Sequence, residues 1–239
     1  MFLVVFDFDH TIVDDNSDVH VNKLFPSEED RLNADKNRSQ FDCWTDYMQD
    51  KFRQLQRFNI TEDDYIQNMQ EIPLTTDFSH LIKYLYSISN SHLIIISDSN
   101  LVFIEAILKH NQLDHMFKDI FTNPAYFNKD EQCLMIEQYG QQTCSTCPSN
   151  MCKREIIEKY MRTKFSEPIP ILYIGDGHND VCAANGLKKG DLVCARSGYR
   201  MAKELKQQEE LGKHKLEADF FEWQNGKEIE DYIKEKWIK

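Results

Sequence analysis

Three short hydrophobic runs along the chain each end in a cluster of polar residues. The runs cover residues 2–6, 93–96 and 171–174, and a weaker run covers residues 192–195. Continuous aliphatic runs of about five residues are typical of strands that are buried on both faces, as in parallel sheets. The pattern therefore predicts four strands. The clusters after the first three are Asp7-Phe8-Asp9, Ser97-Asp98-Ser99-Asn100 and Gly175-Asp176-Gly177-His178-Asn179-Asp180.

Helical patterns separate these strands. Apolar residues recur every three or four positions in residues 78–88 and 101–108, and residues 151–161 and 199–211 are also expected to be helical. Strands that alternate with helices predict an open α/β sheet with right-handed crossovers. In such a sheet, ligands bind beyond the carboxyl ends of the strands, which is where the polar clusters fall.

One segment departs from this alternation. Between residues 18 and 71 there is no strand-like run, whereas large apolar residues recur at helical intervals from Phe41 to Leu55, and Thr61 precedes three acidic residues as at a helix start. We therefore expect a small helical cap inserted after the first strand. The expected division is a cap of residues 18–71 and an α/β core of residues 1–17 and 72–239.

Charge and hydropathy narrow the classes of function. The chain carries 28 Lys and Arg against 40 Asp and Glu, a formal net charge of −12, which opposes binding to nucleic acid. Every hydrophobic run is far shorter than the roughly 20 residues of a membrane span, and the first lacks the basic start of a secretory signal. We therefore expect a cytoplasmic protein with neither a nucleic-acid nor a membrane partner.

Acidic residues follow two of the predicted strands. Asp7 and Asp9, with Thr11, come after the first strand, and Asp176 and Asp180 come after the third. A single aspartate after a strand is most often a turn residue. Clustered carboxylates, however, repel one another and require a compensating cation, and a set of oxygen ligands favours a hard ion such as Mg²⁺.

The order of these residues resembles the four motifs of the haloacid dehalogenase (HAD) superfamily of aspartyl phosphatases. The matching elements are Asp7-Phe8-Asp9-His10-Thr11, Ser97, Lys153 and Gly175-Asp176-Gly177-His178-Asn179-Asp180. Within the superfamily, the chain is most similar to the phosphoethanolamine/phosphocholine and pyridoxal-phosphate phosphatase family. That similarity covers nearly the whole chain and implies a Rossmann-like core with a mainly parallel sheet. Its local signatures are Val13-Asp14-Asp15-Asn16-Ser17-Asp18, Ile96-Ser97-Asp98-Ser99-Asn100, Phe121-Thr122-Asn123-Pro124, the segment from Cys144 to Lys153 and the Gly175-Asp176-Gly177 cluster.

The resemblance implies a phosphomonoesterase of a small phosphorylated metabolite. Asp7 would be the nucleophile that forms an aspartyl-phosphate, and Asp9 the general acid and base. Thr11 would support the nucleophile loop, while Ser97 and Lys153 would hold the phosphoryl oxygens. Taken alone, Ser97 is equally well interpreted as a helix cap, and Lys153 is better interpreted as a solvated side chain.

The resemblance also implies the Mg²⁺ ligands. They would be the Asp7 carboxylate, the Asp9 main-chain carbonyl and Asp176, with water completing the coordination. Asn179 and Asp180 would lie behind these ligands, and Asp180 would orient the metal ligands or Lys153 rather than bind the ion.

Asp18 and Asp98 occupy positions that contact the substrate beyond the phosphate in the resembled family. A carboxylate pair suits an ammonium head group, such as that of phosphoethanolamine or phosphocholine, and also suits the substituents of a pyridoxal ring. The alternative interpretation makes Asp18 a helix cap and Asp98 a turn residue.

A cysteine cluster directly precedes Lys153. With Cys133 or a nearby histidine, its three members would make a Zn²⁺ site, and the alternative is a loop of reduced thiols. The cluster consists of Cys144, Cys147 and Cys152. The other three cysteines are interpreted as packing residues: Cys43, Cys182 and Cys194.

Two other functions remain open from the sequence. The first is a phosphoserine-type HAD phosphatase, whose helical cap has the same position; the Asn16-Ser17-Asp18 and cysteine signatures argue against it. The second is a non-catalytic, zinc-stabilised interaction protein with the same fold. The intact Asp7 and Asp9 argue against that one, because a protein without catalysis could lose either residue without a cost to folding.

Overall fold

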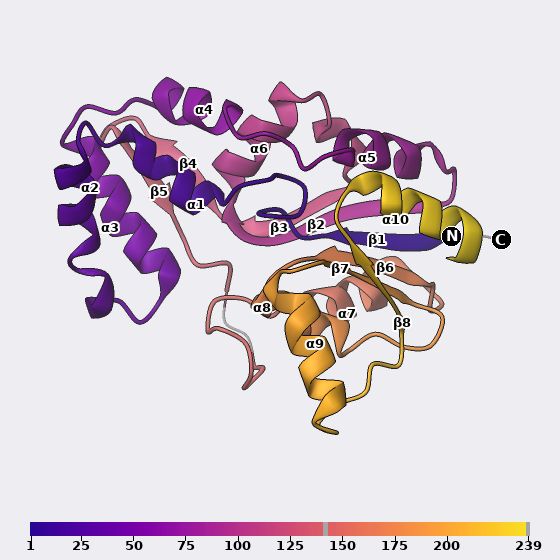
Figure 1. Cartoon of the computed structure of the whole chain (residues 1–239). Coiled ribbons are helices and arrows are strands. Elements are labelled where there is room, and N and C mark those ends of the chain that lie inside the picture. The colour runs from indigo at the N-terminus through magenta and orange to yellow at the C-terminus, as the bar shows by residue number, and fades with distance from the viewer. Residues whose placement is uncertain (141–142, 238–239) are drawn as a thin grey trace.

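The hydrophobic runs form the centre of a parallel sheet. The computed structural model describes residues 1–140 and 143–237, and within them six strands lie in the order β3-β2-β1-β6-β7-β8 (Figure 1). All neighbouring strands in this sheet are parallel. Their bounds are β1 Phe2–Phe6, β2 Ser91–Asn100, β3 Asp119–Asn123, β6 Ile171–Gly175, β7 Leu192–Arg196 and β8 Asp219–Trp223.

Successive residues of β1 enter two different hydrophobic cores. Phe2, Val4 and Phe6 belong to one core, and Leu3 and Val5 to the other. Helices α5 (Phe78–Ser87), α6 (Leu101–His110) and α10 (Gly226–Tyr232) cover the first face of the sheet (Figure 1). Helices α7 (Lys153–Lys164), α8 (His178–Ala184) and α9 (Arg200–Glu210) cover the second. Burial on both faces explains why the run is hydrophobic at every position.

Helices α5, α6, α7 and α9 agree with the predicted ones except at their ends. The expected start of α7 at residue 151 was two residues early, and neither α8 nor α10 was expected. A short 3₁₀ helix, Asp114–Met116, precedes β3, and a π-helical turn, Ile233–Trp237, follows α10.

The chain between β1 and α5 is helical, as expected. Thr61 caps α4 through a reciprocal pair of hydrogen bonds with Asp64, which confirms the predicted helix start. The division into a core and a cap at residues 18–71 remains a prediction. The elements are α1 Ser17–His20, α2 Glu28–Asp35, α3 Trp44–Gln56 and α4 Glu62–Gln70, with 3₁₀ turns at Val21–Leu24 and Arg38–Gln40.

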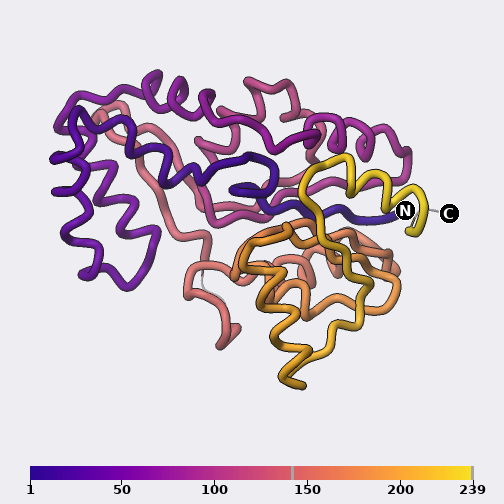
Figure 2. Tube along the Cα trace, viewed as in Figure 1, coloured from indigo at the N-terminus to yellow at the C-terminus, as the bar shows by residue number. Residues whose placement is uncertain are grey.

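A β-hairpin that the sequence pattern did not indicate lies against α3. Strands β4, Ala125–Asn128, and β5, Cys133–Ile136, pair with each other outside the main sheet. The trace in Figure 2 leaves β3 and runs beside α3 before it returns to α7. The Gln49 side chain joins the two elements: its amide donates to the Leu134 carbonyl at 3.2 Å, and its oxygen accepts from the Ile136 N–H at 2.8 Å.

No helix within residues 1–140 and 143–237 has the length and apolarity that a membrane crossing needs.

Replacing Gln49 with Ala should loosen the hairpin. Two backbone groups of β5 would lose their partners, and an unsatisfied buried group costs about 1–3 kcal/mol, so the free energy of unfolding should fall by about 2 kcal/mol. Urea denaturation measures the change. The matched control is Gln67→Ala on the exposed face of α4. An equal loss of stability in both variants would contradict the contact.

Candidate active site

The candidate site lies where the strand order changes direction. From β1 the sheet continues through β2 and β3 on one side, and through β6, β7 and β8 on the other. Ligands bind at such a switch point, beyond the carboxyl ends of the strands. Asp7 follows β1 and Asp176 follows β6, and the Asp7 N–H donates to the Ile174 carbonyl at 2.9 Å. The two acidic motifs therefore meet at one place.

Three buried carboxylates form the centre of the site. Asp7, Asp176 and Asp180 each place a carboxylate oxygen within 4.8 Å of the others. Burial raises the pKa of Asp7 well above its ordinary value, and the neighbouring Asp180 adds to the shift. Burial and Asp180 likewise raise the pKa of Asp176 to about 7. An all-oxygen cluster in which Asp7 and Asp176 resist ionisation fits a hard divalent cation such as Mg²⁺.

Lys153 supplies positive charge to this cluster. Its Nζ lies 2.6 Å from Asp7 Oδ1 and 2.7 Å from Asp180 Oδ1, and the side chain is 1% exposed. Burial alone would lower the pKa of Lys153, but the charges of Asp180 and Asp7 raise it above its ordinary value. The interpretation of Lys153 as a solvated side chain is therefore wrong.

Asp180 is held by four hydrogen bonds. Its Oδ1 accepts from Lys153 Nζ and from the Tyr173 hydroxyl at 2.6 Å, and its Oδ2 accepts from the backbone N–H groups of Asp176 at 3.0 Å and Gly177 at 2.8 Å. A Cβ on Gly175 would lie 2.6 Å from Asp180 Oδ2, so this approach requires glycine. Tyr173 was not among the predicted site residues, because it stands inside a strand-like run.

Asp9 points away from the central cluster toward α1. Its two carboxylate oxygens accept from the N–H and the Oγ of Ser17, each at 3.0 Å. Burial raises the pKa of Asp9 well above its ordinary value, and the charge of Asp18 adds to the shift. The Thr11 hydroxyl donates instead to Asp176 Oδ1 at 3.4 Å. Ser17 is a further site residue that was not predicted as one.

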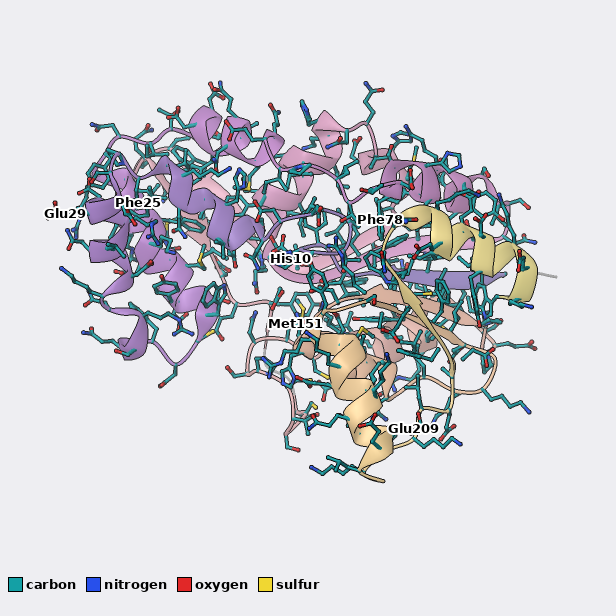
Figure 3. All side chains as sticks on the ribbon, viewed as in Figure 1. His10, Phe25, Glu29, Phe78, Met151 and Glu209 are labelled. Atoms are coloured by element: carbon teal, nitrogen blue, oxygen red, sulfur yellow. The ribbon has the colours of Figure 1, made fainter. Side chains whose placement is uncertain are left out.

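The loop after Asp9 is fixed from β7. His10 adopts a left-handed φ of 54°, and Arg196 donates to its carbonyl at 2.6 Å and to Asp14 Oδ1 at 2.6 Å. Figure 3 labels His10 in this loop and Met151 just before α7, two of the segments that border the site.

The polar end of β2 is clamped by two asparagines. Asn123 donates to the carbonyls of Asp98 at 2.7 Å and Ser99 at 2.9 Å, and accepts from Asn150 Nδ2 at 2.7 Å. Ser97 is fully buried and its Oγ accepts from the Ser99 N–H at 3.2 Å. The interpretation of Ser97 as a helix cap is wrong, because the side chain that caps α6 is Asn100.

A cavity of about 160 Å³ opens beside Lys153. Asp98 and Asn179 line it from the core, and residues 42–45 line it from the start of α3. Asp18 is buried behind this wall, where it accepts from Trp44 Nε1 at 2.6 Å. The side chain that caps α1 is Asn16, so the interpretation of Asp18 as a cap is wrong.

The electrostatic setting of Asp18 links it to the cavity. Burial raises the pKa of Asp18 to about 7, against the opposing effect of the Trp44 hydrogen bond, and the charge of Asp98 adds to the rise.

A larger cavity of about 510 Å³ lies between α7 and residues 186–191 and contains none of the predicted site residues.

The cysteine cluster has a different fourth member from the expected one. Cys182 on α8, interpreted from the sequence as a packing residue, lies with the three cysteines before α7. Cys133 instead lies in β5 within the hydrophobic core. Cys182 was therefore wrongly separated from the cluster, and Cys133 was wrongly considered as its fourth member. The spacing of cysteines along the chain could not show this, because Cys152 and Cys182 are 30 residues apart in the sequence.

A family model described as "Putative Phosphatase" matches residues 2–237. The chain belongs to this phosphatase family. A pyridoxal phosphate phosphatase PHOSPHO2 from Bos taurus is 34% identical over 235 residues, with 97% of this chain and 96% of the relative covered. A phosphoethanolamine/phosphocholine phosphatase from Gallus gallus is 28% identical, with 98% and 88% covered. The resemblance to HAD phosphatases of this family is confirmed.

A solved structure supports the fold. The phospho-aspartyl intermediate analogue of phosphoserine phosphatase superposes with a TM-score of 0.61 at 18% identity, and 96% of this chain and 97% of that one are covered. At this identity the likeness establishes the α/β fold, which was predicted, and not the substrate.

Replacing Lys153 with Met should destabilise the folded chain strongly. The change leaves Asp7 and Asp180 without their buried cation, and breaking a buried ion pair costs about 3–5 kcal/mol of unfolding free energy. Chemical denaturation of metal-free protein measures the loss. The control is Lys159→Met, at an exposed position of the same helix. If both variants were equally stable, the charge balance described for the cluster would be wrong.

Proposed function

We propose that the chain is a Mg²⁺-dependent phosphomonoesterase that works through an aspartyl-phosphate on Asp7. The observation that carries this proposal is the pairing of Asp7 with Lys153 at the switch point of the sheet, beside Asp176 and Asp180. A carboxylate nucleophile, a fixed cation and an oxygen-rich metal site are the parts that phosphoryl transfer needs.

The reaction follows from these positions. An Asp7 carboxylate oxygen attacks phosphorus, an O–P bond forms, and the ester P–O bond breaks. Asp9 gives its proton to the departing alkoxide, and its raised pKa keeps that proton available. Asp9 then takes a proton from water, which attacks phosphorus and releases Asp7 and inorganic phosphate. Lys153 and Ser97 hold the phosphoryl oxygens.

The Asp7 carboxylate, the Asp9 main-chain carbonyl and Asp176 would hold Mg²⁺. When bound, the ion neutralises charge on the phosphoryl group and polarises it toward attack. Asp180 is unsuited to bind the ion directly, because its two oxygens already accept four hydrogen bonds. It orients Lys153 and the backbone of the Asp176 turn instead.

The substrate that fits the cavity is a phosphate ester with a nitrogen cation or a pyridine ring. Asp98 faces the cavity, and Asp18 lies behind it with a hydrogen bond from Trp44 and a pKa that the charge of Asp98 helps to raise. The relatives named above act on pyridoxal phosphate and on phosphoethanolamine or phosphocholine. We take these compounds as the substrate candidates, with small metabolites rather than macromolecules as partners.

Phosphoserine fits less well. Its α-carboxylate would enter the cavity beside Lys153. Among the described lining residues, Lys153 is the one cationic side chain, whereas Asp42 and Asp98 are acidic. Lys153 is already occupied with the phosphoryl group in the proposed reaction. Repulsion between the substrate carboxylate and these residues therefore disfavours it.

Replacing Asp7 with Asn should abolish phosphate release. The amide is a poor nucleophile, and loss of a nucleophile lowers kcat by at least about a thousandfold. Phosphate release from pyridoxal phosphate, phosphoethanolamine, phosphocholine and phosphoserine, with Mg²⁺ and after chelation, measures the effect. Wild-type protein should turn over at least one of the first three, and only with the metal.

Circular dichroism of Asp7→Asn provides the control for folding. A folded Asp7→Asn protein that retains turnover would refute the nucleophile, and wild-type turnover that survives chelation would refute the metal requirement. Folded wild-type protein without activity toward any of the four esters would favour the non-catalytic alternative.

Replacing Asp98 with Asn should weaken binding of cationic esters selectively. A partly exposed ion pair contributes up to about 1 kcal/mol, so KM for phosphocholine should rise about fivefold. KM for 3,3-dimethylbutyl phosphate, an isostere whose tail carries no charge, should stay nearly constant. Steady-state kinetics on both esters give the comparison.

The matched control is Asp42→Asn, an exposed acidic residue that lines the same cavity from the start of α3. Its effect on phosphocholine should be smaller than that of Asp98→Asn. If Asp98→Asn raised KM equally for phosphocholine and for the ester with the uncharged tail, Asp98 would not recognise the cation.

A further inference from the structure

Four cysteines gather where the segment before α7 meets α8. Their Sγ atoms all lie within 4.8 Å of one another, and none forms a disulfide. Three come from the segment before α7 and one from α8. The members of this cysteine cluster are Cys144, Cys147, Cys152 and Cys182.

The separations in the cysteine cluster match a single tetrahedral ion. A Zn–S bond of about 2.3 Å gives a tetrahedron with edges of about 3.8 Å. The Sγ atoms of Cys144 and Cys182 are 3.7 Å apart, and those of Cys152 and Cys182 are 3.9 Å apart. The Thr146 hydroxyl lies 3.1 Å from Cys144 Sγ, where it can donate to a thiolate.

We propose that Cys144, Cys147, Cys152 and Cys182 bind one Zn²⁺ ion. Four sulfur ligands select a soft or borderline ion over Mg²⁺, and four protein ligands leave no open position, so the site is structural. Each thiol gives its proton to solvent as its Zn–S bond forms. Cys144, Cys147 and Cys182 are only half-buried, which leaves the ion a route of entry.

The proposed ion would join the start of α7 to α8. Cys152 directly precedes Lys153, the first residue of α7, and Cys182 follows Asp180 by two residues in α8. A shared ion therefore ties together the two segments whose side chains form the Lys153–Asp180 pair. The inference stands on the sulfur geometry and does not depend on the proposed reaction.

Metal analysis of the purified full chain tests the proposal. Wild-type protein, supplied with Zn²⁺ and dialysed against metal-free buffer, should retain about one zinc per chain. Loss of a residue that only orients a ligand weakens metal affinity by about 10–100-fold. Cys182→Ser removes a proposed ligand itself, so zinc affinity measured against a chelator should fall by at least about a hundredfold. Cobalt-loaded wild-type protein should show the thiolate charge-transfer and visible bands of tetrahedral Co²⁺.

Two control variants locate the ion. Cys133→Ser removes a cysteine outside the cysteine cluster, and Asp7→Asn alters the carboxylate cluster; both should keep the zinc. Wild-type protein that retains no zinc, or a cobalt spectrum without thiolate bands, would overturn the proposal whatever the variants do. Zinc loss from Asp7→Asn but not from Cys182→Ser would place the ion among the carboxylates and overturn it as well.

Discussion

The structure depends on the balance of charge among buried carboxylates. Asp7, Asp176 and Asp180 meet at the ends of two neighbouring strands, and the ammonium of Lys153 offsets only part of their charge. An unbalanced buried charge is expensive, so such a cluster takes up either protons or a cation. The raised pKa of Asp7 and that of Asp176 both reflect this tension. The demand for protons or a cation is therefore a property of the folded chain.

The surrounding structure keeps these groups from moving apart. Strands β1 and β6 are buried on both faces, which fixes the points from which Asp7 and Asp176 start. Hydrogen bonds from Tyr173 and two backbone N–H groups then hold Asp180, while Asn123 and Asn150 hold the end of β2. Because Lys153, Tyr173 and the two asparagines hold these groups from other elements, the surrounding structure opposes repulsion within the site.

The sequence predicts what short-range pattern controls. Hydrophobic runs located β1, β2, β6 and β7, and the polar clusters after three of them contain most of the site. The hairpin β4–β5 was missed because it is stabilised by α3 rather than by its own pattern. Tyr173, Ser17 and Cys182 were missed as site residues for the same reason: their partners are set by tertiary packing, and alone each resembles an ordinary strand, cap or core residue.

Local charge at the proposed site differs from the net charge of the chain. A net charge of −12 opposes anionic macromolecules that contact a wide surface, and its effect on a small ester is screened beyond about 8 Å at physiological ionic strength. Under the proposed function, the ester would meet Lys153 at its phosphate end and Asp98 at the other, both of which line the cavity. An anion with a cationic tail matches that order of charges, whereas an anion with a second acidic group opposes it. The acidic composition and an anionic substrate are therefore compatible.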